Sequence, residues 1–383
     1  MAVIFWYIFC FVLLGIIVIG ILRYLRKKIK YLNEKPETLI PSGASVQYIN
    51  KGLFKAYLED AEKQLVELKE SLVKHGVTHI YFTHGTFVGD DPFHLVGILE
   101  SVLPRKYKFI TSKLRKTIKK SQDLFIKDIG NFTQSHIDLL KDIFGEAIKI
   151  EFLNWSSGNY HYARVDGMFK IINELARTTN PGDKVLLLGH SHAGQIFALM
   201  TQVFKDDHLR RRLLDIFDKE IDPLEVERSL EKVVSLKLDF VTFGTPCRYE
   251  WKLSHQMRVL HFINHRHTDV LGGTFSGVVN TRDGDYIQQW AGAGTDMMSP
   301  TPHEMMINKK LDHLLDAGMN IEQIQKNIRQ RRRLHGHGHH YLVDYGDNGK
   351  YPNFLKTIFG HVVYTRLNLM KLHLYLIGEK FYK

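Results

Sequence analysis

The stretch KVLLLGHSHAG, residues 184–194, constrains the fold of this chain more than any other part of it. A short apolar run, typical of a buried parallel strand, ends abruptly in the residues GHSHAG, and residues 195–204 are apolar at helical spacing. A strand, a sharp turn centred on a serine and then a helix form the layout of a nucleophile elbow. Such an elbow raises the serine hydroxyl above the sheet edge.

The turn of such an elbow needs very small residues two before and two after the serine, because the strand and the helix nearly touch there. Gly189 and Ala193 meet that demand and Gly194 gives additional room, although Ala193 departs from the strict G-x-S-x-G pattern. The alternative is an ordinary strand-to-helix turn in which the serine only caps the helix. The flanking strand and helix favour the first interpretation, with Ser191 as a nucleophile.

Strand and helix patterns alternate along the rest of the chain, which indicates a doubly wound α/β domain with a mostly parallel sheet. We expect this domain to span residues 51–383, with a charged, helix-prone insertion at about 206–234. Helices are expected at 53–74, 162–175 and 353–381, and strands at 77–83, 148–153, 185–188, 236–243, 259–264 and 341–345.

The N-terminal 22 residues carry no charged side chain and as a helix would be long enough to span a hydrocarbon core of ~30 Å. Five basic residues follow at once, whereas a cleavable signal peptide normally has its charge before the apolar run. We therefore expect an uncleaved anchor at 1–22, a basic juxtamembrane segment and linker at 23–50, and a catalytic body on the cytoplasmic side. The basic residues are Arg23, Arg26, Lys27, Lys28 and Lys30.

The net charge of +11 is concentrated in clusters, which besides the juxtamembrane segment are residues 105–120 and 329–333. Near a bilayer such clusters favour anionic lipid head groups. Nucleic acid is the competing partner, but no recognised nucleic-acid-binding motif accompanies the charge, so none is expected. The chain has only two cysteines, Cys10 and Cys247, which excludes a disulfide framework.

A serine nucleophile needs a histidine to remove its proton, an acid to orient the histidine, and donors for the tetrahedral oxyanion. One donor would be the backbone N–H of His192, the residue after the serine. The second is expected in the glycine-rich loop HGTFVG at 84–89, from the N–H of Thr86 or Phe87. The alternative is a glycine-rich loop with no oxyanion role.

With these parts in place, the sequence resembles the α/β-hydrolase superfamily, and within it a poorly characterised bacterial branch of hydrolases. The resemblance implies that the catalytic histidine lies beyond the last strand, at the same sheet edge as the serine. It covers most of residues 77–366. It rests on the segments HGTFVG at 84–89, WSSGNYHYAR at 155–164, GHSHAGQ at 189–195, TFGTP at 242–246, GDYIQQ at 284–289, LVDYG at 342–346 and GHVVYTR at 360–366.

His361 follows the expected last strand in a glycine-preceded turn, and we expect it to be the base, with His340 as the reserve candidate. The cluster of His335, His337, His339 and His340 precedes that strand and should lie at the opposite edge. A metal site there is the alternative, but the cluster lacks a carboxylate or cysteine partner. We expect a solvated loop, and no metal or cofactor.

Two aspartates are candidates for the acid. Asp269 lies just past the strand at 259–264, the usual position in this fold, and Asp285 lies in the GDYIQQ segment. Both give the chain order serine, acid, histidine, and either could instead be a surface aspartate. Asn159, His161 and Arg164 are expected to shape the pocket, with a buried ion pair as the alternative for Arg164.

The sequence therefore predicts a membrane-anchored, esterase- or lipase-like serine hydrolase that cleaves carboxylic esters, with lipid or other apolar acyl esters as candidate substrates. An acyltransferase that passes the acyl group to another acceptor is the chemically adjacent alternative. The rival from a different class is a catalytically inactive hydrolase fold that serves as an interaction module at the membrane.

Overall fold

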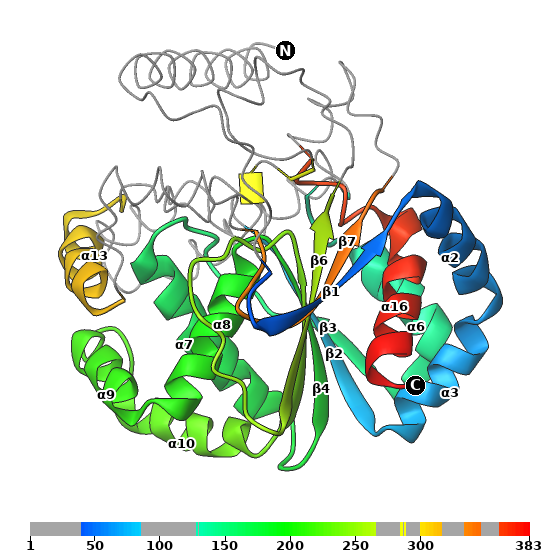
Figure 1. The fold of residues 1–383 in the computed structure, drawn as a ribbon. Helices are drawn as coiled ribbons and strands as arrows, with labels where there is room; N and C mark the ends of the chain where they lie inside the picture. Colours follow the sequence, from blue (N-terminus) through cyan, green and yellow to red (C-terminus); the bar gives the residue numbers. More distant parts are fainter. Residues whose placement is uncertain are drawn as a thin grey trace, which may run out of the picture.

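The computed structural model describes residues 40–85, 128, 130–265, 284–285, 287–288, 299–315, 333–345 and 360–383. Within them, the strands form one parallel sheet with the order β1-β7-β6-β5-β4-β2-β3 (Figure 1). The strands are β1 (Gly43–Ile49), β2 (Val77–Thr83), β3 (Lys149–Phe152), β4 (Lys184–His190), β5 (Lys237–Phe243), β6 (Met257–Asn264) and β7 (His337–Val343).

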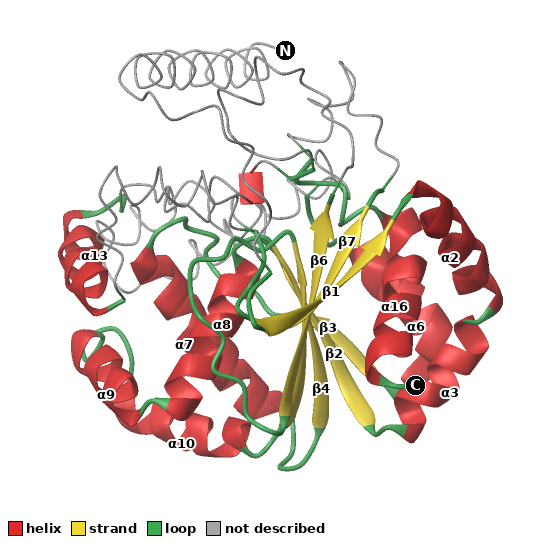
Figure 2. Ribbon diagram, viewed as in Figure 1, coloured by secondary structure: helices red, strands yellow, loops and turns green. Residues whose placement is uncertain are grey.

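Helices cover both faces of the sheet, so the α/β class expected from the alternating patterns is confirmed (Figure 2). One face carries α7 (His161–Thr178), α8 (Ala193–Lys205), α9 (Asp207–Ile216), α10 (Pro223–Val234) and α13 (Pro302–Leu314). The other carries α2 (Lys51–Lys63), α3 (Leu65–Lys74), α6 (Gln134–Phe144) and α16 (Leu367–Phe381).

Strand β4 is an interior strand, between β5 and β2, and is apolar on both sides. Val185 and Leu187 pack into the core beneath α7 and α8, while Leu186 and Leu188 pack into the core beneath α6 and α16. A strand covered on both faces has no polar side, which explains the continuous apolar run in its sequence.

The strand order places β2 between β3 and β4, so the chain leaves β2 in one direction and returns on its other side. In an open parallel sheet, such a reversal opens a crevice at the carboxyl ends of the two strands, where ligands bind. Residues 84–85 follow β2 and Ser191 follows β4 at this point. The topology therefore brings the expected oxyanion loop and the expected nucleophile to one place.

The N-terminal part of the domain differs from expectation in two ways. Residues 43–49, assigned above to a linker, form the edge strand β1, which pairs in parallel with β7. Its polar and apolar residues alternate over only a few positions after a proline and a glycine, a weak strand signal. The helix expected at 53–74 is two helices that meet at Gln64, and the first begins after the Asn50 cap.

The C-terminal part also differs. Strand β7 begins at His337, four residues before the expected start at 341, and α16 begins at Leu367 rather than 353. Residues 360–366 form turns, starting at Gly360 with φ of +82°. This backbone conformation favours glycine.

The prediction of a solvated loop for the histidine cluster is wrong, because His335, His339 and His340 are buried. Three imidazoles stack in the interior, with the ring of His261 4.0 Å from that of His335 and 4.6 Å from that of His340. Each ring donates from one nitrogen to a backbone carbonyl and accepts at the other, so each is a neutral tautomer. The carbonyl acceptors belong to Thr245, His337 and Ser45, and the donors are Trp251, Thr242 and the His335 N–H.

This stack predicts a loss of stability in acid. Burial lowers the pKa of His340 to about 4, against 6.5 for an unperturbed histidine. As the pH falls from 6.5 to 4, His340 becomes protonated in the unfolded chain but stays neutral in the folded chain. For this group, the free energy of unfolding therefore falls by on the order of 3 kcal/mol. In urea titrations at pH 7 and 4.5, we expect His340→Gln to lose less stability than the wild type. Equal losses would contradict this account.

In the part of the chain that the structure describes, no helix is both long and apolar enough to cross a bilayer. The expected anchor at 1–22, the basic residues at 23–30 and the basic stretch at 105–120 lie outside the described residues.

Candidate active site

The elbow around Ser191 joins β4 to α8 with two close approaches of the backbone. A Cβ atom on Gly189 would lie 2.5 Å from the ring of Phe197, and one on Gly194 would overlap the side chain of Thr245. The tight position after the serine is thus Gly194, whereas Ala193 fits, fully buried. This explains why the departure from the strict motif is tolerated here.

Ser191 has a positive φ of 55°, in the left-handed region that residues other than glycine rarely adopt. Its N–H donates to the Phe243 carbonyl at 2.8 Å and its carbonyl accepts from the Thr245 hydroxyl at 2.8 Å. These bonds, from the last residue of β5 and from the loop after it, hold the backbone in the strained conformation. Strain of this kind is typical of functional sites.

The strain predicts that Ser191→Gly unfolds at a higher urea concentration than Ser191→Ala. Glycine adopts a positive φ without steric cost, so we expect a difference of about 1 kcal/mol in the free energy of unfolding. Both variants lack the hydroxyl, so the comparison isolates the backbone. A glycine variant less stable than the alanine variant would show that the turn is unstrained.

The structure brings Ser191, His361 and Asp285 together in one hydrogen-bonded chain. His361 Nε2 lies 2.8 Å from Ser191 Oγ, and His361 Nδ1 lies 2.7 Å from Asp285 Oδ2. All three residues are buried. Because the carboxylate can only accept, Nδ1 carries the proton, and Nε2 is left to accept the serine O–H. This is the arrangement in which a histidine acts as a general base toward a serine.

Asp285 is held at both carboxylate oxygens. The Tyr364 hydroxyl donates to Oδ2 at 2.9 Å, and the backbone N–H of Gln288 donates to Oδ1 at 2.8 Å. Burial and the adjacent carboxylate raise the pKa of Tyr364 well above 10, so its hydroxyl remains a donor. Gly244 passes so close that a Cβ there would lie 2.6 Å from Oδ2. Tyr364, Gln288 and Gly244 were not anticipated from the sequence.

His361 is supported by a second imidazole. His190 donates from Nε2 to the His361 carbonyl at 3.1 Å, and the two rings lie 4.9 Å apart. Burial, together with charge repulsion from His361, lowers the pKa of His190 to about 3, so this ring stays neutral. The neighbouring Gly360 carbonyl accepts from the Asn264 amide at 2.9 Å, which ties the turn to the end of β6.

The reserve base does not reach the serine: His340 is in β7, and its ring nitrogens bond to the backbone of His335 and Ser45. The other acid candidate, Asp269, lies outside the described residues. Asp285 follows Gly284, which pairs with His265 just beyond β6.

Of the residues expected to donate to an oxyanion, only His192 lies within the described residues. Gly85 follows β2, and a Cβ there would lie 2.7 Å from Ser191 Cβ, so the start of this loop passes close to Ser191. His192 caps the N-terminus of α8, and within the described residues its N–H donates to no backbone carbonyl. It is thus available to an anion, as N–H groups at helix N-termini are. Thr86 and Phe87 lie outside the described residues.

The side chain of His192 also contacts the Ser191 hydroxyl, which the sequence did not indicate. Its Nδ1 lies 3.2 Å from Ser191 Oγ. Burial is the largest cause that lowers the pKa of His192 well below 6.5, and Arg164, His361 and Arg248 add to it by charge repulsion. The ring is therefore neutral.

The residues expected to shape the pocket form a network at the start of α7. Arg164 is fully buried and donates from Nε to the Tyr249 hydroxyl at 3.0 Å and from a terminal nitrogen to Asn159 Oδ1 at 3.1 Å. The Tyr249 hydroxyl in turn bonds to His161. The guanidinium of Arg248 lies 3.0 Å from the other nitrogen of His161.

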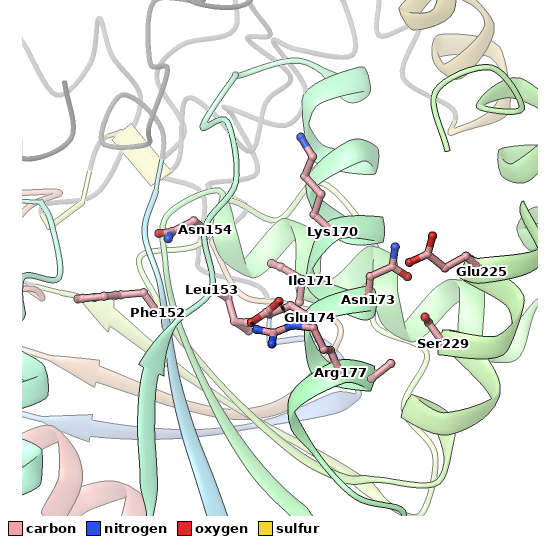
Figure 3. A pocket seen from close by; sticks show the side chains of 11 residues that line it. Phe152, Leu153, Asn154, Lys170, Ile171, Asn173, Glu174, Arg177, Glu225 and Ser229 are labelled. Atoms are coloured by element: carbon pink, nitrogen blue, oxygen red, sulfur yellow. Dashed lines mark hydrogen bonds and ion pairs between the residues drawn. The ribbon is translucent and has the colours of Figure 1, made fainter. Parts of the chain in front are cut away.

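A separate surface pocket of about 690 Å³ opens between the end of β3, α7 and α10 (Figure 3). Arg177 and Glu174 form an ion pair at its wall. It shares no residue with the Ser191–His361–Asp285 chain. Its lining is Phe152, Leu153, Asn154, Lys170, Ile171, Asn173, Glu174, Ala176, Arg177, Glu225 and Ser229.

No protein-family model, curated protein or solved structure matches this chain.

Proposed function

We propose that this protein is a serine hydrolase of the α/β-hydrolase type that cleaves carboxylic esters. The observation that carries the proposal is the buried chain from Ser191 Oγ through His361 to Asp285, with distances of 2.8 Å and 2.7 Å. Ser191 follows β4 at the point where the strand order reverses between β2 and β4, and ligands of open parallel sheets bind at such points. The strained serine between a strand and a helix supports the same assignment.

In the proposed reaction, His361 Nε2 takes the proton of Ser191 as Oγ attacks the ester carbonyl. The carbonyl oxygen becomes negative and accepts from the backbone N–H of His192. Imidazolium then protonates the leaving alcohol, and Asp285 stabilises the positive charge through Nδ1–H. Water, deprotonated by the same imidazole, releases the acid from the acyl-enzyme and restores the serine.

Hydrolysis of p-nitrophenyl esters of increasing acyl length tests this proposal. We expect turnover by the purified protein, with a chain-length optimum that identifies the acyl group. Adding a second alcohol separates the alternatives, because an acyltransferase gives mainly the new ester and a hydrolase mainly the acid. No turnover with any ester and no ester formation would favour the inactive interaction module.

We also propose that the apolar run at 1–22 anchors the hydrolase to a membrane, with the domain on the cytoplasmic side because basic residues follow the run. Deleting residues 1–30 should move the protein from the membrane pellet to the soluble fraction, with unchanged kcat for a water-soluble ester. The matched control is the full chain extracted in detergent. A truncated chain that still pellets with membranes would contradict a single anchor.

A further inference from the structure

The hydroxyl oxygen of Ser191 lies between two imidazoles rather than one. His361 Nε2 is 2.8 Å from Oγ, and His192 Nδ1 is 3.2 Å from the same atom. The two rings come from segments far apart in the sequence: His192 is the N-cap residue of α8, and His361 lies in the turns before α16. The general base of a serine hydrolase accounts for only one of them.

Counting protons assigns different roles to the two rings. Asp285 fixes the proton of His361 on Nδ1, so Nε2 accepts the only hydrogen that Ser191 Oγ carries. Oγ then has no hydrogen left for His192. A favourable contact between Oγ and His192 Nδ1 requires that Nδ1 carry the hydrogen and donate it. The tautomer of His192 is thus Nδ1–H, with a lone pair on Nε2.

We propose that His192 is a second catalytic imidazole, a neutral N–H donor to Ser191 Oγ that stabilises the negative charge on this oxygen while its bond to the acyl carbon forms and breaks. This inference rests on the proposed serine hydrolase reaction and adds a residue to it.

The charge on Oγ arises at two points in the reaction. During acylation, Oγ loses its proton to His361 Nε2 as its bond to the acyl carbon forms and the carbonyl pair moves to oxygen. During deacylation that bond breaks, Oγ takes back the electron pair, and His361 returns the proton. In both transition states Oγ is partly an alkoxide, and hydrogen bonds to a charged partner are stronger than neutral ones. The proton on His192 Nδ1 stays on nitrogen throughout.

The surroundings keep this donor neutral. His192 is buried, and the charged or titratable groups around it, Arg164, Arg248, His190 and His361, all disfavour a positive charge on its ring. A neutral imidazole whose protonation is suppressed by its site can polarise an oxygen without competing as a base.

Two replacements of His192 with similar shape separate the effect of its N–H donor from the effect of its shape. Asparagine places its amide N–H close to where His192 Nδ1–H lies, whereas leucine has a similar shape and no donor. The readout is the second-order rate of fluorophosphonate labelling, which requires attack by Oγ but no ester leaving group, together with kcat and KM for a p-nitrophenyl ester. Circular dichroism and urea titration establish that both variants are folded.

We expect His192→Leu to label about tenfold more slowly than the wild type and to lose about tenfold in kcat, with KM nearly unchanged. His192→Asn should recover most of that loss. In ¹⁵N spectra of the wild type labelled in histidine, Nδ1 of His192 should carry the proton. The acid limb of the pH–rate profile should stay in place in both variants, because His192 does not titrate there.

Equal rates for the asparagine and leucine variants would overturn the donor role, as would a proton on Nε2 of His192. A shift of the acid limb in the leucine variant would instead make His192 a titrating base. Failure of the proposed function looks different, because then the wild type itself neither labels nor turns over.

Discussion

Ser191→Ala is expected to lower kcat for a water-soluble ester by ~10⁴-fold or more while the protein stays folded. The hydroxyl is the atom that bonds to the acyl carbon, and removing the nucleophile from such a set typically costs several orders of magnitude. Little stability should be lost, because the backbone bonds of this residue to Phe243 and Thr245 do not involve the hydroxyl.

The matched control is Ser157→Ala, a buried serine whose hydroxyl bonds to His84 rather than to His361. We expect this variant to retain far more activity than Ser191→Ala in the same assay. Activity near the wild-type level in Ser191→Ala would remove the hydrolase assignment, whatever the control does.

His361→Ala should also lose ~10⁴-fold or more in kcat, because among the described residues no other imidazole has the proton arrangement of a base toward Ser191. His340→Ala should keep most of its activity, since both of its ring nitrogens bond to backbone groups in the sheet. It should instead cost stability, because it leaves the buried N–H of His335 without its acceptor.

Measured with one soluble ester and at one pH, the two histidine variants give a direct comparison. An active His361→Ala together with an inactive His340→Ala would contradict the site as the structure places it. Urea titration of both proteins separates lost chemistry from lost folding, since the His340 variant is expected to keep its activity although its free energy of unfolding falls by ~1–3 kcal/mol.

The central features of the site were accessible from sequence because they depend on local patterns. The apolar run before Ser191 is typical of a buried strand, and the glycines on either side of Ser191 permit the tight turn from strand to helix. The position of His361 followed from topology, since residues after parallel strands gather at one sheet edge. The choice between Asp269 and Asp285 did not, because both precede His361 in the chain. Tyr364, which donates to Asp285, comes from a segment that is distant in the sequence.

The buried histidines were harder to predict, and for a physical reason. A run such as HGHGHH looks like a polar loop because each ring has two polar nitrogens. The rings of His335 and His340 are buried because both nitrogens of each find partners, which the sequence does not reveal. The contact of the His192 side chain with Ser191 Oγ was missed similarly, because the elbow motif involves only the backbone N–H of this residue.

The most direct test of the account is the site of covalent labelling by a fluorophosphonate. Intact-protein mass spectrometry followed by peptide mapping of the wild-type full chain should find one adduct, on Ser191, and none after heat unfolding. The reagent needs an oxygen activated by a base, which the 2.8 Å contact with His361 supplies. An unmodified Ser191 in the folded protein, or an adduct on a different serine, would contradict the account.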